Sequence, residues 1–255
     1  MQRLARTLRG IARKRTDRKR ERPPLTTDLL KRVLGELRAA NPRMGGGGAI
    51  QVSAALTAGV YGLLRISEVA PAKANAHDPA KDTRGCDVHF FPSEYRPKYY
   101  TIHLRTSKTD VFRRATTIRV FATGSSDCPV QAMATWMAIR RAGRNAPLFQ
   151  RRKGRNLTRQ RLTHVLRNTL ERLGFEGKAY ASHSLRAGGA VSLAAAGYGT
   201  ETIMLLGRWK SASFMVYLAM SNHTARGAQR SMAQVGPGDI TERERERYRN
   251  RYEGE

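Results

Sequence analysis

Cysteine is scarce in this chain of 255 residues, which contains only Cys86 and Cys128. They lie 42 residues apart, and neither a CxxC pair nor a histidine-rich segment accompanies them. The sequence therefore encodes no disulfide framework and no zinc site, and it favours a reducing compartment. We expect the protein to use no metal and no cofactor.

Long hydrophobic runs are also missing. The most apolar stretch, residues 49–64, has 16 residues, includes Gln51, Ser53 and Thr57, and leads directly into Arg65. A membrane-spanning helix needs about 20 predominantly apolar residues, so no membrane partner is expected. The N-terminus carries charge where a secretory signal would carry an apolar run, which argues against secretion.

Acidic residues are few relative to basic ones. The chain has 20 Asp and Glu against 47 Lys and Arg, a formal net charge of +27. A compact fold tolerates such an excess best when a polyanion covers its surface, so nucleic acid is the expected partner. The 40% content of apolar residues is sufficient for a packed core. We expect an intracellular protein associated with DNA, in the nucleoid or cytoplasm, or in the nucleus of a eukaryote.

Several signatures of phosphate and metal chemistry are absent from the sequence. It has no glycine-rich loop followed by Lys-Ser/Thr, no HExxH, and no DxD or clustered carboxylates that would hold two magnesium ions. These absences disfavour an ATPase and a metal-dependent nuclease. A reaction at phosphate would then depend on cations and a nucleophilic side chain.

The charge distribution divides the chain into three parts. Residues 1–24 form a basic arm or linker, with ten Lys or Arg in the first 22 positions, closed by Pro23 and Pro24. Residues 25–235 carry the periodic hydrophobic pattern of one folded domain. Residues 236–255 are highly charged and are expected to be disordered or a frayed helix.

Hydrophobic periodicity predicts a mainly α-helical domain with one small antiparallel β-sheet, an α+β fold. A helix is expected from Thr26 or Thr27 through Leu37, and a second over residues 49–64. Strands are predicted at residues 88–91, 99–104 and 116–121, which are rich in β-branched and aromatic residues and are separated by Pro, Gly, Ser and charged residues. Further helices are predicted at residues 130–140, 158–173, 185–195, 200–206 and around 214–220.

Four short strings carry the residues suited to chemistry on a phosphate. Arg65 is followed three residues later by Glu68, a spacing that lets the carboxylate orient the guanidinium, although such a pair is more often a surface ion pair. Lys108 lies between two predicted strands. The third string begins a helix and contains His183 and Arg186. The fourth follows the helix predicted at residues 200–206 and contains Trp209 and Tyr217.

Taken singly, each of these strings is a weak signal, but their order is informative. The succession of Arg65, Lys108, His183-x-x-Arg186 and Leu-Gly-Arg-Trp209 before Tyr217 resembles the catalytic domain of tyrosine recombinases, the phage integrase family. The resemblance runs over residues 25–222. The Gly-Arg-Trp-x-Ser string is also similar to members carried by eukaryotic mobile elements, such as cryptons and DIRS-type retrotransposons.

The resemblance implies a DNA breaking and rejoining reaction through a 3′-phosphotyrosine intermediate. In that reaction Tyr217 would be the nucleophile, Arg65 and Arg186 would bind the non-bridging phosphate oxygens, and Trp209 would donate its indole N–H. His183 would assist deprotonation of Tyr217 or donate a hydrogen bond to the phosphate, and Lys108 would protonate the leaving 5′ oxygen. Glu68 would support Arg65. The resemblance also implies double-stranded DNA as partner and a homotetramer on paired sites.

The sequence departs from this family in two respects. Trp209 stands where many members have His and precedes Tyr217 by eight residues, one fewer than in most bacterial relatives. In addition, only about 24 residues precede the catalytic domain, where the family usually has a helical domain that closes around DNA. The alternatives are a truncated, non-catalytic DNA-binding derivative, or DNA relaxation of the type IB topoisomerase kind. A basic RNA-binding protein would explain the charge but not the order of the strings.

Overall fold

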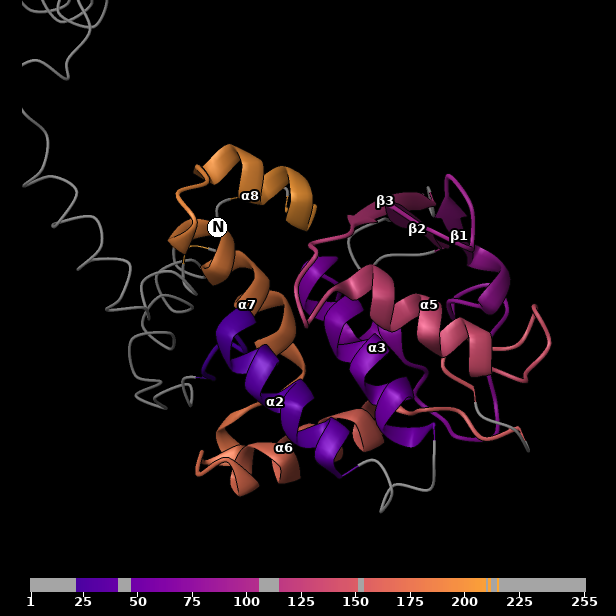
Figure 1. Cartoon of the computed structure of the whole chain (residues 1–255), viewed down its shortest axis with the longest axis horizontal. Coiled ribbons are helices and arrows are strands. Elements are labelled where there is room, and N and C mark those ends of the chain that lie inside the picture. The colour runs from indigo at the N-terminus through magenta and orange to yellow at the C-terminus, as the bar shows by residue number, and fades with distance from the viewer. Residues whose placement is uncertain are drawn as a thin grey trace, which may run out of the picture.

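The computed structural model describes residues 22–40, 47–105, 115–150, 154–209, 211 and 215 (Figure 1). Its helices are α2 (Thr27–Ala39), α3 (Gly48–Tyr61), α4 (Ile66–Val69), α5 (Pro129–Ile139), α6 (Arg159–Arg172), α7 (Ser182–Ala195) and α8 (Thr200–Gly207). The strands are β1 (Val88–Phe91), β2 (Tyr99–Leu104) and β3 (Thr116–Phe121), and two 3-10 turns are η2 (Gly85–Asp87) and η3 (Gly177–Ala179). The predicted mainly α fold with a small antiparallel sheet is confirmed.

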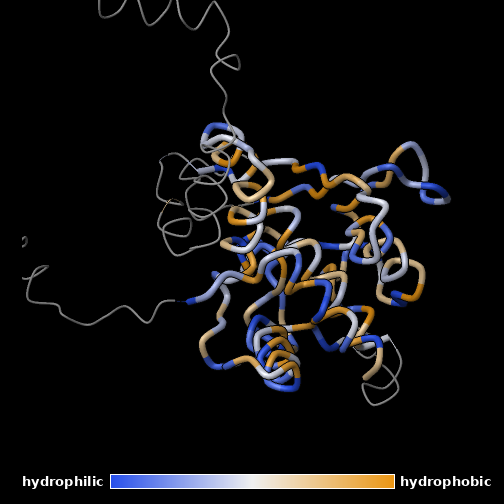
Figure 2. The backbone as a smooth tube through the Cα atoms, turned by 60° about the vertical axis from the view of Figure 1, so that its left-hand side comes forward, coloured by the Kyte–Doolittle hydropathy of each residue, from blue (hydrophilic) through white to orange (hydrophobic). Residues whose placement is uncertain are grey.

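Helix α2 forms as its sequence predicts. The Thr26 side chain caps the helix by accepting a hydrogen bond from the Leu29 backbone N–H. Its buried residues are the five predicted for its inner face, Leu29, Leu30, Val33, Leu34 and Leu37. The helix therefore buries one apolar stripe. Figure 2 shows that hydrophobic and hydrophilic stretches alternate along the whole folded chain.

Helix α3 lies at the centre of the helical body, between α5 on one side and α2 and α7 on the other (Figure 1). It is apolar on nearly all sides and most of its residues are buried, as expected for a central helix. The helix ends at Tyr61, three residues before the predicted end. Leu63 there adopts a left-handed backbone with φ 46°, which turns the chain toward Arg65.

The sheet contains β1, β2 and β3 in sequence order, and both pairings are antiparallel. All three strands have the predicted bounds. Along β3, buried Ile118 and Val120 alternate with exposed Thr117, Arg119 and Phe121, so only one face of this edge strand packs on the core. Leu104 pairs with Thr116, so the predicted Lys108 string lies in the connection between two paired strands.

The remaining predicted helices are present with small shifts at their ends. Helix α5 begins at Pro129, a residue favoured at the first helical position. Helix α7 begins at Ser182, three residues earlier than its hydrophobic pattern indicated. The predicted arm, the charged tail and nearly all of the segment around 214–220 lie outside the described residues. Among the residues that are described, no helix is long and apolar enough to cross a membrane.

Helix α7 is held unusually close to its neighbours by glycine. A Cβ at Gly188 would overlap the backbone of Leu25, and one at Gly189 would overlap the Val60 carbonyl of α3. The Leu25 backbone N–H also donates to the Ser184 carbonyl over 2.8 Å. These contacts place the first two turns of α7 against both the entrance to α2 and the end of α3.

This close packing predicts a large effect for one added methyl group. We expect Gly188→Ala to destabilise the protein by about 1–3 kcal/mol or more, because the obstructing atoms are backbone atoms that cannot rotate away. Gly35→Ala is the matched control, since nothing lies within 4 Å of its added Cβ and it lies inside α2. It should stabilise by about 0.5–1 kcal/mol. Urea unfolding of both variants tests this, and equal midpoints would contradict it.

Candidate phosphate-binding site

The site is built on the corner between α3 and α4, where Arg65 is the N-cap of α4. The Arg65 guanidinium lies 2.9 Å from Oε1 of Glu68, and the Arg65 backbone N–H donates to Oε2 over 2.9 Å. The Glu68 side chain is only 4% exposed. This pair is thus an internal contact and not the common surface ion pair, and the carboxylate orients the guanidinium as its spacing predicted.

Arg186 reaches the same corner from α7. Its Nη1 donates to the Leu63 carbonyl over 3.2 Å, and its Nη2 donates to the Gly207 carbonyl at the end of α8. The side chain is buried, with 4% of the residue exposed. Because two carbonyls from different elements hold the guanidinium, its plane is fixed between α3 and α8.

Trp209 completes one wall of this site. The Arg186 guanidinium lies over the Trp209 ring at 4.2 Å from the centroid, a cation–π contact. A Cβ at Gly207 would overlap the Trp209 ring, so glycine is required there for the indole to pack. His183 lies one turn before Arg186 in α7 and is exposed, so the two predicted residues share a helix but differ sharply in burial.

Arg208 is a member of the site that sequence reasoning did not single out. Its Nη2 lies 2.9 Å from Oε2 of Glu68, and its two terminal nitrogens also donate to the carbonyls of Gly62 and Leu63 over 3.4 Å. Desolvation by burial lowers the pKa of its guanidinium, opposed by the Glu68 charge and reinforced by that of Arg65. Leu63 and Arg208 are the two non-glycine residues with positive φ in the described part of the chain. Both therefore hold a costly backbone conformation at the same site.

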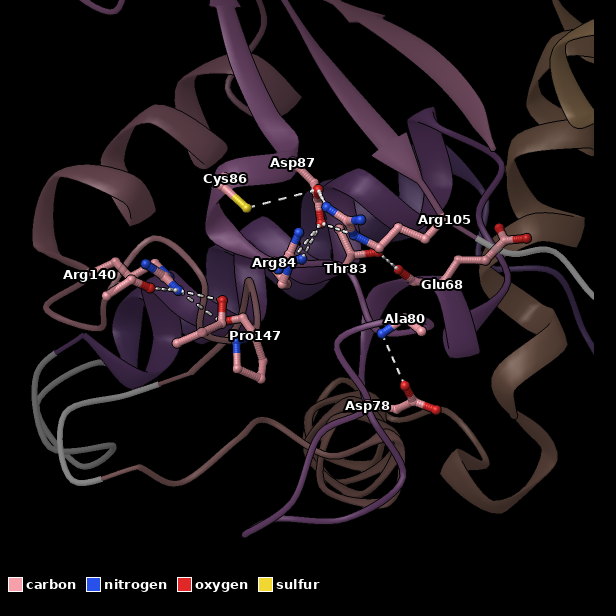
Figure 3. A network of polar contacts seen from close by, with 12 residues as sticks. Glu68, Asp78, Ala80, Thr83, Arg84, Cys86, Asp87, Arg105, Arg140 and Pro147 are labelled. Atoms are coloured by element: carbon pink, nitrogen blue, oxygen red, sulfur yellow. Dashed lines mark hydrogen bonds and ion pairs between the residues drawn. The ribbon is translucent and has the colours of Figure 1, made fainter. Parts of the chain in front are cut away.

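A separate ion-pair network supports the base of the β2–β3 hairpin (Figure 3). Arg105 follows β2 directly, and its Nη2 and Nε donate to the two oxygens of buried Asp87 over 2.6 and 3.3 Å. This contact raises the pKa of Arg105. Thr83, at the edge of this network, donates its hydroxyl to the Glu68 backbone carbonyl over 2.8 Å. The hairpin base and the Arg65 corner are thus joined by a short chain of polar contacts.

The structure brings Arg65, Glu68, Arg186 and Trp209 into one cluster and places His183 on the same helix as Arg186. Lys108 and Tyr217, the two remaining predicted site residues, lie outside the described residues. Within the described ranges, no group of three or more His, Cys, Asp or Glu could hold a metal ion. The fixed guanidinium groups of Arg65 and Arg186 are of a kind that suits an anion.

Comparison with known proteins places part of the chain beside a known family. The family model described as "Phage integrase family" matches residues 98–223. Residues 98–223 therefore match the phage integrase family. The matched segment contains Lys108, His183, Arg186, Trp209 and Tyr217, whereas Arg65 and Glu68 precede it. The structure joins these two residues to the matched segment through the contacts of Arg186 and Arg208 with Leu63 and Glu68. A search of curated proteins returned no match.

Solved structures share the fold of this chain. The XerH site-specific recombinase bound to palindromic difH substrate in a post-cleavage complex superposes with a TM-score of 0.59 at 14% identity, covering 82% of this chain and 53% of the recombinase chain. The pre-cleavage XerH complex gives 0.56 at 15% identity, with 80% and 52% covered. The fold is that of a tyrosine recombinase catalytic domain. The chain spans about half the length of the recombinase chains it matches.

Proposed function

We propose that this protein cuts and rejoins double-stranded DNA at specific sites through a covalent 3′-phosphotyrosine intermediate. The observation that carries the proposal is the convergence of Arg65 and Arg186 on one corner, although they stand 121 residues apart in the chain. Planar guanidinium groups that are already fixed in orientation suit the non-bridging oxygens of a phosphodiester. The net charge of +27 supports DNA, a polyanion, as the partner of this protein.

In the proposed reaction Tyr217 attacks the phosphorus of a DNA phosphodiester. A bond forms between phosphorus and the Tyr217 oxygen while the bond from phosphorus to O5′ breaks. His183 accepts the phenolic proton, and Lys108 donates a proton to the leaving O5′. A 5′-hydroxyl then attacks the phosphotyrosine in the reverse sense, which restores Tyr217. Because the covalent link conserves the phosphodiester energy, the reaction balances without a nucleotide or a metal.

In the same proposal Arg65, Arg186 and the Trp209 indole stabilise the negative charge that develops on the phosphate oxygens. Fixed donors of this kind are effective because they need no reorganisation during the reaction. Strand exchange between two DNA sites requires several active sites in one assembly. We therefore propose that the chain works as a homo-oligomer, a tetramer on paired sites.

Covalent trapping tests this function. The purified protein is incubated without metal with nicked duplexes that cover the DNA flanking its gene, so that the short 5′-hydroxyl fragment diffuses away. We expect protein joined to DNA on a denaturing gel for the unmodified chain, and none for Tyr217→Phe. Tyr198→Phe is the matched control, because Tyr198 is an exposed tyrosine of the described fold and should leave the adduct unchanged.

Three other results would contradict the proposal. An adduct that persists in Tyr217→Phe would assign the nucleophile to another residue. Tight DNA binding with no adduct for the unmodified chain would favour a non-catalytic DNA-binding protein. Relaxation of supercoiled DNA by a strictly monomeric protein would instead favour the topoisomerase-like alternative.

A further inference from the structure

Arg208 stands where the backbone reverses at the end of α8. It is the C-cap of that helix, with φ 56° and ψ 41°, a left-handed conformation that is unfavourable for a side chain of this size. The reversal directs its guanidinium back to the α3–α4 corner, where it contacts Glu68 and two carbonyls. The side chain is 17% exposed. Arg208 is therefore largely withdrawn from solvent.

Glu68 is held by a guanidinium on each side. Its Oε1 lies 2.9 Å from Nη1 of Arg65, and its Oε2 lies 2.9 Å from Nη2 of Arg208. One buried carboxylate thus connects two cations that are 143 positions apart in the sequence. The formal charges of Arg65, Glu68 and Arg208 sum to +1.

The sign of this sum matters for a site that binds a phosphate. A carboxylate in direct contact with Arg65 cancels most of the field that Arg65 can offer to an anion, and it also repels that anion. With Arg65 and Glu68 alone, the formal charge would be zero. Arg208 restores the net positive charge while leaving Glu68 in place to orient Arg65.

Holding Arg208 in this position has a cost that packing does not explain. Its Nε is buried and has no hydrogen-bond partner among the described residues, and burial lowers the pKa of the group. An unpaired buried donor and a left-handed arginine are both unfavourable. Their coincidence on one side chain indicates that the charge itself is required at this place.

We propose that Arg208 is a positioning residue that neutralises Glu68, so that Glu68 can orient Arg65 without reducing the positive charge presented to the scissile phosphate. This inference rests on the proposed function only in taking phosphate as the ligand of Arg65. It assigns Arg208 no direct contact with DNA.

Charge compensation and simple tethering of α8 predict opposite results for a double variant. Arg208→Gln gives the three-residue cluster a formal charge of 0, Glu68→Gln gives +2, and the double variant returns it to +1. We expect Arg208→Gln to lower the rate of covalent adduct formation about ten- to a hundredfold. The double variant should recover at least half of that loss on a logarithmic scale. If Arg208 is only a tether, the double variant is no faster than Arg208→Gln, which would overturn the proposal.

Arg208→Lys separates the loss of charge from a loss of folding. This variant keeps the charge and loses most of the hydrogen-bond geometry. Compensation predicts adduct formation closer to the unmodified chain than to Arg208→Gln, and a tether predicts a loss similar to Arg208→Gln. Thermal unfolding of each variant accompanies the kinetics. The Arg172–Glu36 pair, 2.7 Å apart on the surface, supplies matched controls in Arg172→Gln and Glu36→Gln, for which no rate recovery is expected.

Equilibrium binding to an uncut duplex provides a readout that is independent of the chemistry. The slope of log affinity against log salt reports phosphate contacts, at about 0.9 per contact. Because Glu68 then cancels the charge that Arg65 presents to its phosphate, we expect the magnitude of the slope to fall by about 0.9 in Arg208→Gln and to return in the double variant. If the slopes follow this pattern but no adduct forms for the unmodified chain, the proposed reaction fails while the compensation stands. If adducts form but the slopes and rates show no recovery, the compensation fails alone.

Discussion

Arg186→Lys should reduce the rate of covalent adduct formation by about 10²- to 10³-fold, the loss typical of removing one fixed donor to a developing oxyanion. Arg186 holds two carbonyls and the face of Trp209 at the same time. A lysine ammonium is a single point charge without a planar fork, so it cannot make these contacts together. The measurement is single-turnover kinetics on nicked DNA at saturating protein.

Arg140→Lys is the matched control for this prediction. Arg140 also donates to several backbone carbonyls, including those of Leu148 and Pro147, but it lies away from the Glu68 corner (Figure 3). We expect Arg140→Lys to lower the unfolding temperature while the folded fraction keeps its rate. Equal loss of rate in both variants would show that Arg186 acts through stability alone.

Lys108→Ala should reduce cleavage of ordinary DNA by about 10²- to 10⁴-fold, the usual contribution of a general acid. A substrate in which sulfur replaces the leaving O5′ should restore the rate to within about tenfold of the unmodified chain. A thiolate leaves without receiving a proton, because thiols are far more acidic than alcohols. The measurement compares the two substrates in each variant, following release of the 5′ fragment.

Lys98→Ala is the control for this experiment, since Lys98 is an exposed lysine just before β2, at the end of that strand remote from Lys108. Both substrates should react with it at the unmodified rate. A Lys108→Ala defect of the same size on the sulfur substrate would mean that Lys108 binds DNA and does not protonate the leaving group. The mutant and the chemical change together therefore separate proton donation from binding.

The sequence predicted the sheet well because its physical signal is local. Each strand is rich in β-branched or aromatic residues and is bounded by turn formers. This pattern can be recognised without knowledge of distant contacts. Helix α2 was predicted with its cap and its buried face for the same reason. The end of α3 was placed three residues too late, since the apolar pattern continues through Leu63 and Leu64 although the backbone has already turned.

The site could be predicted only in part. Arg65 and Glu68 are three residues apart, so their contact follows from local geometry. Arg208 was missed because it is one of 47 basic residues, and no local pattern shows which of them turns inward. Its direction depends on a left-handed backbone at residue 208 and on a carboxylate 140 positions earlier. For the same reason, the burial of Arg186 could not be read from its spacing to His183.

The seating of Leu25 on α7 has a mechanical consequence. The chain enters the folded body through a backbone hydrogen bond to Ser184 and a close contact with Gly188, both on the helix that carries His183 and Arg186. Any load applied through residues before Leu25 is therefore delivered first to this helix and not to a surface loop. Ser184 and Gly188 each lie two residues from Arg186 along this helix. The residues that precede Leu25 are thus attached directly to the helix that carries the site.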